Sequence, residues 1–483
     1  MLARHVLGYI PSLVIPALSS FVAIYCYTRL MEPDEYGYYA LALSAMTLLN
    51  AVFFYWLQVS IPRLMPQAVR EGKSEALKVT SYVAHGIMSF LLAMLTFLII
   101  GFIPGPGMQM VAWLAVPLAL ARAALNMNQA FHRSALDFKR YNLLECGQAL
   151  LGLIIGLVLV YYFELGVVGA ILGMVIGMMV MLMVDIKVLT ALTIRQFDRE
   201  QLREITRFGW PLVLSFGLSF LISTSDRFII EHFRDASEVG IYAAGYSLMD
   251  RIATIVFMIV ATPSFPLTVH KLEQEGVEAA REQTYHNGVA ILVLALPACA
   301  GLMLTTHHLA ELLIGEDFRS GAALVMPWIA ASALFNGMTL HYFDHAFHLA
   351  KKPLFFMLTQ GPVAIFNVMA NLIIIPKLGY MGAAYSTTAS YMLLMFMSIT
   401  IGRIVFKIRF PFKPAFQIFC SVILMAAVLE LFTFPVNMLG LTIMVFLGGV
   451  TYGAGLLLFN VMSIRQKLPE IAHRYLANRS SKS

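Results

Sequence analysis

Charged side chains inside long apolar stretches are the residues of this sequence that could do chemistry. Asp250 and Arg251 stand well inside an apolar segment that begins near Gly240, and Asp226 and Arg227 stand inside the preceding segment. A charge within a membrane is costly, so such residues face a water-filled cavity or pair with one another. These four residues are therefore the first candidates for a functional site.

Arg251 is the strongest candidate because of its depth. It lies about 16 Å of helical rise from the start of its segment, too far for the side chain to reach the membrane surface easily. Tyr246, Asp250 and Thr254 recur at i, i+4 and i+8, so the same helix should present a polar face. We expect Arg251 to face a wet cavity or an acidic partner. The alternative is a buried pair with Asp226 that only joins two helices.

The other arginines of the apolar segments have less certain roles. Arg29 and Arg227 lie nearer the ends of their segments, so their side chains can extend to the membrane surface. Arg122 lies inside its segment, one helical turn before Asn126. We expect Arg122 either to add a second positive charge to a cavity or to pair two helices, and the sequence favours neither.

Polar residues also follow one face of a later segment, at its cytoplasmic end. His341, Asp344, His345 and His348 stand at i, i+3, i+4 and i+7, so they share a helical face. Such a set can hold a transition metal or take up protons. A polar face needs no function at a membrane surface, however, and no cysteine or glutamate nearby completes a metal site. We predict no metal or other cofactor, and proton coupling by His341, Asp344 and His345 stays open.

The composition places these residues in a membrane protein. Of the 483 residues, 59% are hydrophobic and only 12% are charged, which excludes a soluble enzyme. The sequence contains fourteen apolar stretches of about 20 residues, the length that crosses a bilayer as a helix. The four cysteines fall inside these stretches without close spacing, so we expect neither disulfides nor a zinc site.

The basic residues indicate the orientation of these helices. If the N-terminus is cytoplasmic, most of the 33 Lys and Arg residues fall in loops on the cytoplasmic side, as membrane proteins require. The net charge of +6 then belongs to loops beside an anionic leaflet, and we expect no nucleic acid as a partner. Both termini are predicted to be cytoplasmic.

The chain contains an internal repeat. The residues from Glu35 to Ala40 (EYGYYA) match those from Glu238 to Ala243 (EVGIYA). Further matches pair Ala130-Phe131-His132 with Ala346-Phe347-His348, and Leu165-Gly166 with Leu378-Gly379. Each half therefore has six spans and, because six is even, both halves cross the membrane in the same direction.

We therefore expect an all-α polytopic membrane protein with fourteen transmembrane helices, built as two parallel six-helix bundles plus two C-terminal helices. The predicted parts are an N-terminal bundle (1–189), a cytoplasmic amphipathic linker (190–208), a C-terminal bundle (209–402), and two additional helices with a cytoplasmic tail (403–483). A duplicated bundle of this kind is typical of a transporter whose substrate path runs between the repeats.

The charged candidates do not follow the repeat. Asp250 and Arg251 correspond to Thr47 and Leu48 in the first half. A residue that only the fold needs should tend to recur in both copies. The asymmetric charges are therefore expected to mark the transport path.

The repeated patches resemble a known family. Residues 28–30 followed by 34–40, and residues 225–227 followed by 238–243, are similar to the conserved patches of the polysaccharide transporter family, the Wzx-type flippases. These O-antigen and exopolysaccharide flippases belong to the multidrug/oligosaccharidyl-lipid/polysaccharide (MOP) exporter superfamily. The resemblance covers nearly the whole chain, including the six plus six plus two arrangement, and implies a MATE-like fold in the bacterial inner membrane.

The resemblance also implies a function. Such a protein flips an undecaprenyl-pyrophosphate-linked oligosaccharide from the cytoplasmic to the periplasmic leaflet by alternating access, for O-antigen, capsule or exopolysaccharide synthesis. The pyrophosphate would then bind to paired arginine donors, supplied by Arg251, Arg122, Arg227 and Arg29. The supporting polar residues would be Asp250, Asp226, Tyr246, Asn50, Asn126 and Asn336. Expected partners are the lipid-linked oligosaccharide, membrane lipids, a polysaccharide polymerase and a chain-length regulator.

Two other functions are alternatives to this one. A MATE-like, ion-coupled antiporter of drugs or other small molecules would share the fold, but it should carry carboxylates deep in the N-terminal half, whose first four spans have none. A membrane-embedded glycan polymerase or ligase should have a large outer loop, whereas the longest outer loop here runs only from His307 to Ser320. No glycine-rich nucleotide-binding loop is present. We therefore expect a transporter and not an enzyme.

Overall fold

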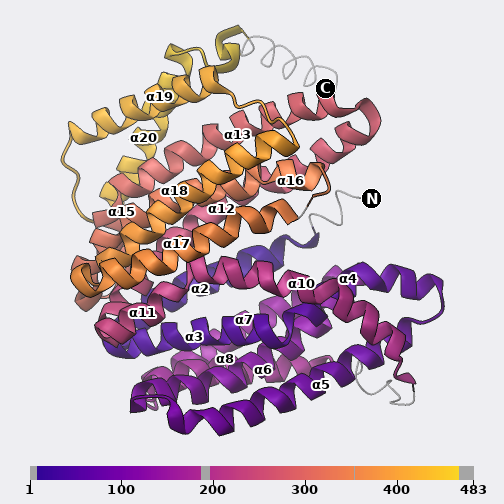
Figure 1. The fold of residues 1–483 in the computed structure, drawn as a ribbon. Coiled ribbons are helices and arrows are strands. Elements are labelled where there is room, and N and C mark those ends of the chain that lie inside the picture. The colour runs from indigo at the N-terminus through magenta and orange to yellow at the C-terminus, as the bar shows by residue number, and fades with distance from the viewer. Residues whose placement is uncertain (1–7, 187–195, 353, 467–483) are drawn as a thin grey trace, which may run out of the picture. The chain divides into compact units, whose positions relative to one another are not determined.

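The computed structural model describes residues 8–186, 196–352 and 354–466, and these residues form helices and no strand. Helices form because backbone groups inside a membrane must be hydrogen-bonded within their own segment. The first repeat and the start of the second contain α2 (Ile10–Leu30), α3 (Pro33–Phe53), α4 (Tyr55–Arg70), α5 (Ser74–Ile99), η1 (Ile100–Phe102), α6 (Pro106–Ser134), α7 (Phe138–Tyr161), α8 (Gly166–Val184), α10 (Arg199–Ser223) and α11 (Ser225–Phe233) (Figure 1).

The rest of the described chain is equally helical. Its elements are α12 (Ala236–Glu275), α13 (Val277–Leu304), α14 (Thr306–Leu313), α15 (Glu316–Met338), the π-helical turn η3 (Thr339–Phe343), α16 (His345–Leu349), α17 (Leu354–Leu378), α18 (Tyr380–Val405), α19 (Phe412–Glu430), α20 (Met438–Leu458) and η4 (Val461–Ser463).

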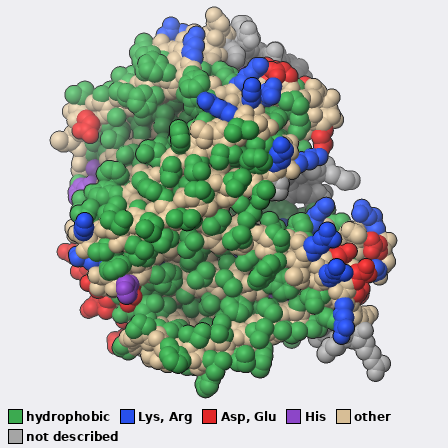
Figure 2. Space-filling view, in the orientation of Figure 1, with side chains coloured by type: hydrophobic (Ala, Val, Ile, Leu, Met, Phe, Trp, Pro, Cys, Tyr) green, Lys and Arg blue, Asp and Glu red, His purple; other side chains and the backbone are tan. Residues whose placement is uncertain are grey.

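Among the described residues, 14 helical segments are long and apolar enough to cross a membrane, which confirms the predicted number. Apolar side chains such as Phe97, Ile365 and Phe446 are 74%, 68% and 73% exposed, as expected of surfaces that face lipid. Figure 2 shows helices covered mainly by hydrophobic side chains, with Lys and Arg gathered near their ends. The chain is a multi-pass membrane protein.

The chain divides into two compact units, which are described separately. The first unit comprises residues 1–244, 314–318 and 364–383, and the second comprises residues 245–313, 319–363 and 384–483. The predicted domain limits near 189, 208 and 402 stay a prediction. Within the predicted linker, residues 190–195 lie outside the described residues, and α10 begins at Arg199.

In the first unit, the carboxylates of the repeated glutamates lie at the starts of two helices. Gly166 and Gly379, at the starts of α8 and α18, have φ values of 46° and 57°. A Cβ at Gly166 would overlap the carboxylate of Glu35, and a Cβ at Gly379 would overlap that of Glu238. The backbone N–H of Tyr380 donates to Glu238 Oε2 at 2.9 Å. A negative charge stabilises a helix start, so this contact explains why both glutamates recur.

The repeated glycines let two backbones touch, also within the first unit. A Cβ at Gly37 would overlap the carbonyl group of Ala236, and a Cβ at Gly240 would overlap that of Pro33. Pro33 and Ala236 occupy equivalent positions in the two repeats, so the contact is symmetric. Only glycine fits at these positions without a backbone shift.

Candidate functional site

Arg251 lies on α12, about 22 Å of helical rise beyond the start of this helix at Ala236. Its side chain is exposed and makes no hydrogen bond or ion pair with another residue that the structure describes. Thr254 on the next turn is also exposed, whereas Tyr246 is buried. A guanidinium at this depth needs water or a ligand, so α12 presents a charge that the fold does not use.

The second unit supplies the surroundings of Arg251. Gly245 on α12 faces the backbone of Ala322 on α15, and Gly337 on α15 faces the ring of Phe257 on α12. The two helices therefore pack along the stretch of α12 that carries Arg251. Asp250 and Asn336, both predicted to support the site, are half-buried on α12 and α15.

Arg122 has an acidic neighbour in the first unit. Its guanidinium lies 3.8 Å from Glu145 Oε1 on α7, and Glu145 also accepts a 2.6 Å hydrogen bond from Gln129 on α6. The side chains of Arg122 and Glu145 are 27% and 14% exposed, so the pair is partly open. The sequence interpretation did not name Glu145, although it is the only acidic residue within α7 and could have been singled out for that reason.

The predicted asparagines of the first unit differ in their bonding. Asn126 donates to Gln58 Oε1 at 3.4 Å, which joins α6 to α4. Asn50 on α3 is 8% exposed, and its Nδ2 has no hydrogen-bond partner among the described residues. An unpaired buried amide is costly, so Asn50 suits a role with water or a substrate hydroxyl.

Asp226 and Arg227 form bonds at the start of α11. Asp226 is fully buried and accepts a 2.5 Å hydrogen bond from the hydroxyl of Tyr242. Arg227 donates to the hydroxyl of Ser44 on α3 at 3.0 Å. These bonds join α11 to α12 and to α3 within the first unit. The sequence left a helix-joining role open for Asp226, with a different partner, and indicated none for Arg227.

Arg29 lies in acidic surroundings. Its guanidinium stacks 3.7 Å from the centre of the Tyr25 ring and donates to the Tyr25 carbonyl at 2.8 Å. It also lines a cavity of about 600 Å³ in the first unit. The acidic residues of that cavity are Glu32, Asp34, Glu35, Glu164 and Asp317. With so many carboxylates around it, Arg29 is poorly placed to attract an anion.

The predicted histidine face is altered by the π-helical turn at Thr339–Phe343. His341 stacks on Phe257 with ring centres 5.7 Å apart, and His345 lies 4.7 Å from the Phe265 ring. Asp344 is 2% exposed and accepts a 2.8 Å hydrogen bond from Ser398. The three predicted residues thus point to different neighbours, and no metal-binding cluster is found among the described residues.

A buried network at the end of α8 escaped the sequence interpretation. Asp185 is 5% exposed and bonds to Asn128 Nδ2 at 2.9 Å and to His132 Nε2 at 2.8 Å. Arg140 lies 3.6 Å from its other oxygen, and Tyr82 donates to Asn128 at 2.6 Å. The network joins α5, α6, α7 and α8 of the first unit. It contains His132, and the repetition of this histidine in the second half could have indicated that it has a polar partner.

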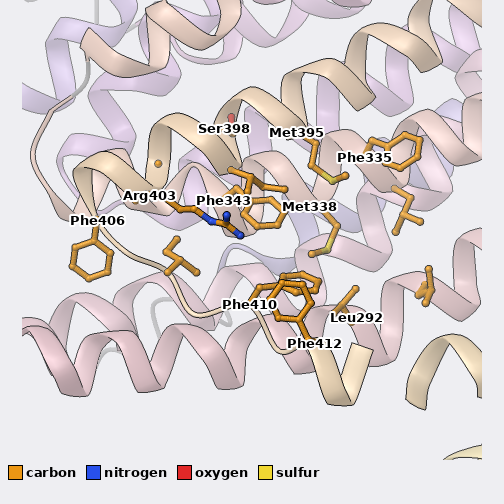
Figure 3. A pocket seen from close by; sticks show the side chains of 16 residues that line it. Leu292, Phe335, Met338, Phe343, Met395, Ser398, Arg403, Phe406, Phe410 and Phe412 are labelled. Atoms are coloured by element: carbon orange, nitrogen blue, oxygen red, sulfur yellow. The ribbon is translucent and has the colours of Figure 1, made fainter. Parts of the chain in front are cut away.

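The second unit also contains an apolar cavity of about 300 Å³ between α13, α15 and α18 (Figure 3). Its walls include Leu292 from α13, Met338 from α15 and Met395 from α18. Arg403 is the one charged residue of its lining, and its side chain points towards Phe343. The sequence did not predict this cavity, because its lining is mostly apolar and the residues selected from the sequence were charged or polar.

Comparison with known proteins identifies a matching family and a shared fold. A family model described as "Polysaccharide biosynthesis protein" matches residues 27–324. The search of curated proteins finds no significant match.

Solved structures share the fold. A structure titled "Lipid II flippase MurJ, inward closed conformation" has a TM-score of 0.76 and 12% identity, covering 96% of this chain and 100% of that one. An inward-facing multidrug resistance MATE family transporter of the MOP superfamily has a TM-score of 0.63 and 18% identity, with 82% and 97% covered. A mutant MATE transporter VcmN of Vibrio cholerae has a TM-score of 0.56 and 16% identity, with 83% and 96% covered. These matches confirm the predicted MOP-type fold.

Proposed function

The chain belongs to the polysaccharide biosynthesis protein family, and we propose that it is a flippase for an undecaprenyl-pyrophosphate-linked oligosaccharide. It moves this lipid from the cytoplasmic to the periplasmic leaflet of the bacterial inner membrane, with both chain termini cytoplasmic. The product serves the synthesis of O-antigen, capsule or exopolysaccharide. This proposal combines the family with the transporter fold.

The depth and exposure of the Arg251 guanidinium support the proposal most directly. A substrate that carries a pyrophosphate needs a cation within the membrane, and a guanidinium offers paired donors to phosphate oxygens. Arg251 supplies a deep, exposed guanidinium with no partner among the described residues. Arg122 is a second cation of the proposed path, although Glu145 compensates part of its charge.

The other polar residues predicted for the path would bind the sugars. Asn50 has a buried amide nitrogen that lacks a described partner, and a sugar hydroxyl would satisfy it. Tyr246, Asn126 and Asn336 supply further donors and acceptors. The polyprenyl tail stays in the lipid, because transferring it through a polar path would expose apolar surface to water.

Replacement of Arg251 tests the proposal. Export of the glycan should fall by about tenfold to a hundredfold in Arg251→Ala, the loss expected for one charge-assisted bond to phosphate. The measurement is the surface glycan made by cells that contain the variant as their only copy, with lipid-linked oligosaccharide accumulating in the membrane. Arg251→Lys, which keeps the charge but loses the paired donors, should fall in between.

Lys271→Ala is the matched control. Lys271 is also a cation on α12, but it is paired with Glu275 at 2.9 Å near the end of the helix, so its loss should leave export unchanged. Normal export by Arg251→Ala, at equal amounts of protein in the membrane, would remove the basis for the proposed substrate. Loss of resistance to a drug, without any change in glycan, would instead favour the antiporter.

A further inference from the structure

We propose that the apolar cavity of the second unit holds part of one acyl chain of an anionic membrane phospholipid, whose phosphate is bound by Arg403 and Lys407. The cavity lies between α13, α15 and α18 and borders the segment that joins α18 to α19 (Figure 3). The inference concerns a lipid of the surrounding membrane. It goes beyond the proposed substrate and does not depend on it.

The walls of the cavity suit a hydrocarbon chain. Leu292, Leu296, Phe335, Met338 and Met395 line it from three helices, and none of them carries a polar group. A hollow with such walls forgoes dispersion contacts unless something apolar fills it. α13, α15 and α18 are all parts of segments long and apolar enough to cross a membrane, so the acyl chains of the bilayer are the apolar material proposed to fill the cavity.

Two cations belong to the chain segment that borders this cavity. Arg403 lines it directly, and Lys407 stands between the lining residues Phe406 and Ile408. Both side chains are exposed, and neither has a hydrogen bond or ion pair within the described part of the chain. Free cations beside the end of a membrane helix attract anionic lipid head groups.

The neighbouring segment is held in place by aromatic contacts. Phe410 stacks on Phe343 with ring centres 6.0 Å apart, and Phe412 packs edge-on against Phe410 at 4.9 Å. The hydroxyl of Tyr342 donates to the carbonyl of Arg409 at 3.0 Å. Tyr342 and Phe343 belong to the π-helical turn, so this irregular turn anchors the wall. The site is therefore built before any lipid arrives.

The size of the cavity favours a phospholipid over the tail of the proposed substrate. With about 300 Å³, the cavity has room for about ten groups of the size of a water molecule. That volume matches part of one acyl chain. A polyprenyl tail is several times larger, so most of it would remain outside. A membrane phospholipid supplies an anionic phosphate together with a short chain, of which this cavity would hold a large share.

Lipid binding to the full-length protein in detergent tests this inference. Native mass spectrometry should detect phosphatidylglycerol retained by the wild-type protein, and phosphatidylcholine should be retained much less. The variant Arg403→Ala/Lys407→Ala should bind phosphatidylglycerol about tenfold to thirtyfold more weakly. Excess inorganic phosphate should not displace the lipid, because it offers no chain to the cavity.

Two further variants separate charge from shape. Lys351→Ala/Lys352→Ala removes the same charge from another loop and should bind the lipid like the wild type. Leu296→Trp fills the cavity but keeps both cations, so it should also lose the lipid. Equal binding by Arg403→Ala/Lys407→Ala and the wild type would overturn the inference. Displacement of phosphatidylglycerol by equimolar undecaprenyl phosphate would overturn it too, by assigning the cavity to the carrier. Unchanged glycan export in the double variant would leave the proposed function intact.

Discussion

The two repeats are alike where α8 and α18 begin and differ towards the ends of these helices. At the starts, Glu35 meets Gly166 and Glu238 meets Gly379 in the same way. Towards the ends, the first repeat has a carboxylate with three polar partners, whereas in the second the described bond of Asp344 is to a single hydroxyl. A contact that only glycine can accommodate restricts substitution at that position, whereas other residues can replace a polar pair.

The polar pair at the equivalent positions of the two repeats consists of different residues. Asn128 in the first repeat corresponds to Asp344 in the second, and Asp185 corresponds to Ser398. The hydrogen bond joins the same two positions in both units, but the carboxylate has changed sides. In the first unit His132 and Arg140 surround the acid. The first pair is therefore an ionic network and the second is a single bond to a neutral hydroxyl.

Replacement of Asp185 should have the largest effect. Asp185→Asn removes the buried carboxylate that Asn128, His132 and Arg140 contact, so the free energy of unfolding should fall by about 3 kcal/mol, the upper end for a hydrogen bond to a charged group. Thermal unfolding of the purified protein in detergent measures the loss. Asp137 is an exposed acid that faces Arg140 at 3.9 Å and also caps α7 by accepting from the Arg140 backbone N–H. Asp137→Asn keeps the cap and removes only the charge, so it is the control and should change stability by less than about 1 kcal/mol. Equal losses for the two acids would contradict the buried network.

The glycines of the repeat should give intermediate and equal effects. Gly37→Ala and Gly240→Ala each place a Cβ against a backbone carbonyl, and such overpacking costs about 1–3 kcal/mol. Gly86→Ala is the control, because its Cβ would meet nothing within 4 Å and alanine favours a helix. Thermal unfolding is again the measurement. A clear loss in one repeat but not in the other would show that the symmetric contact is not required in both copies.

The sequence predicted the features that depend on local pattern. Apolar length alone indicated the fourteen spans, and the repeat that begins at Glu35–Ala40 indicated two copies of one bundle. Depth along the helix singled out Arg251, whose exposure the structure now describes. Each of these inferences needs only a short stretch of residues or a comparison between two such stretches.

The partners of the polar residues could not be predicted in the same way. Asp185 and Asn128 are 57 residues apart, and Arg227 and Ser44 are 183 residues apart. Which of many polar groups meet is decided by how the helices pack, and no periodicity records that choice. The π-helical turn before Asp344 likewise rotates the histidine face away from regular helical spacing.

Replacement of Asp344 should have the smallest effect on stability. In Asp344→Asn the amide oxygen can still accept from Ser398, so the free energy of unfolding should change by less than about 1 kcal/mol. If Asp344 takes up a proton during transport, as the open alternative holds, glycan export should nevertheless fall, because an amide cannot be protonated at this site. Ser398→Ala is the matched control: it removes the same hydrogen bond but leaves the carboxyl group, so export should persist. A stable Asp344→Asn protein with normal export would assign this pair to packing alone. A fall of several kcal/mol in the free energy of unfolding would instead mean that Asp344 contributes as much to stability as Asp185 does.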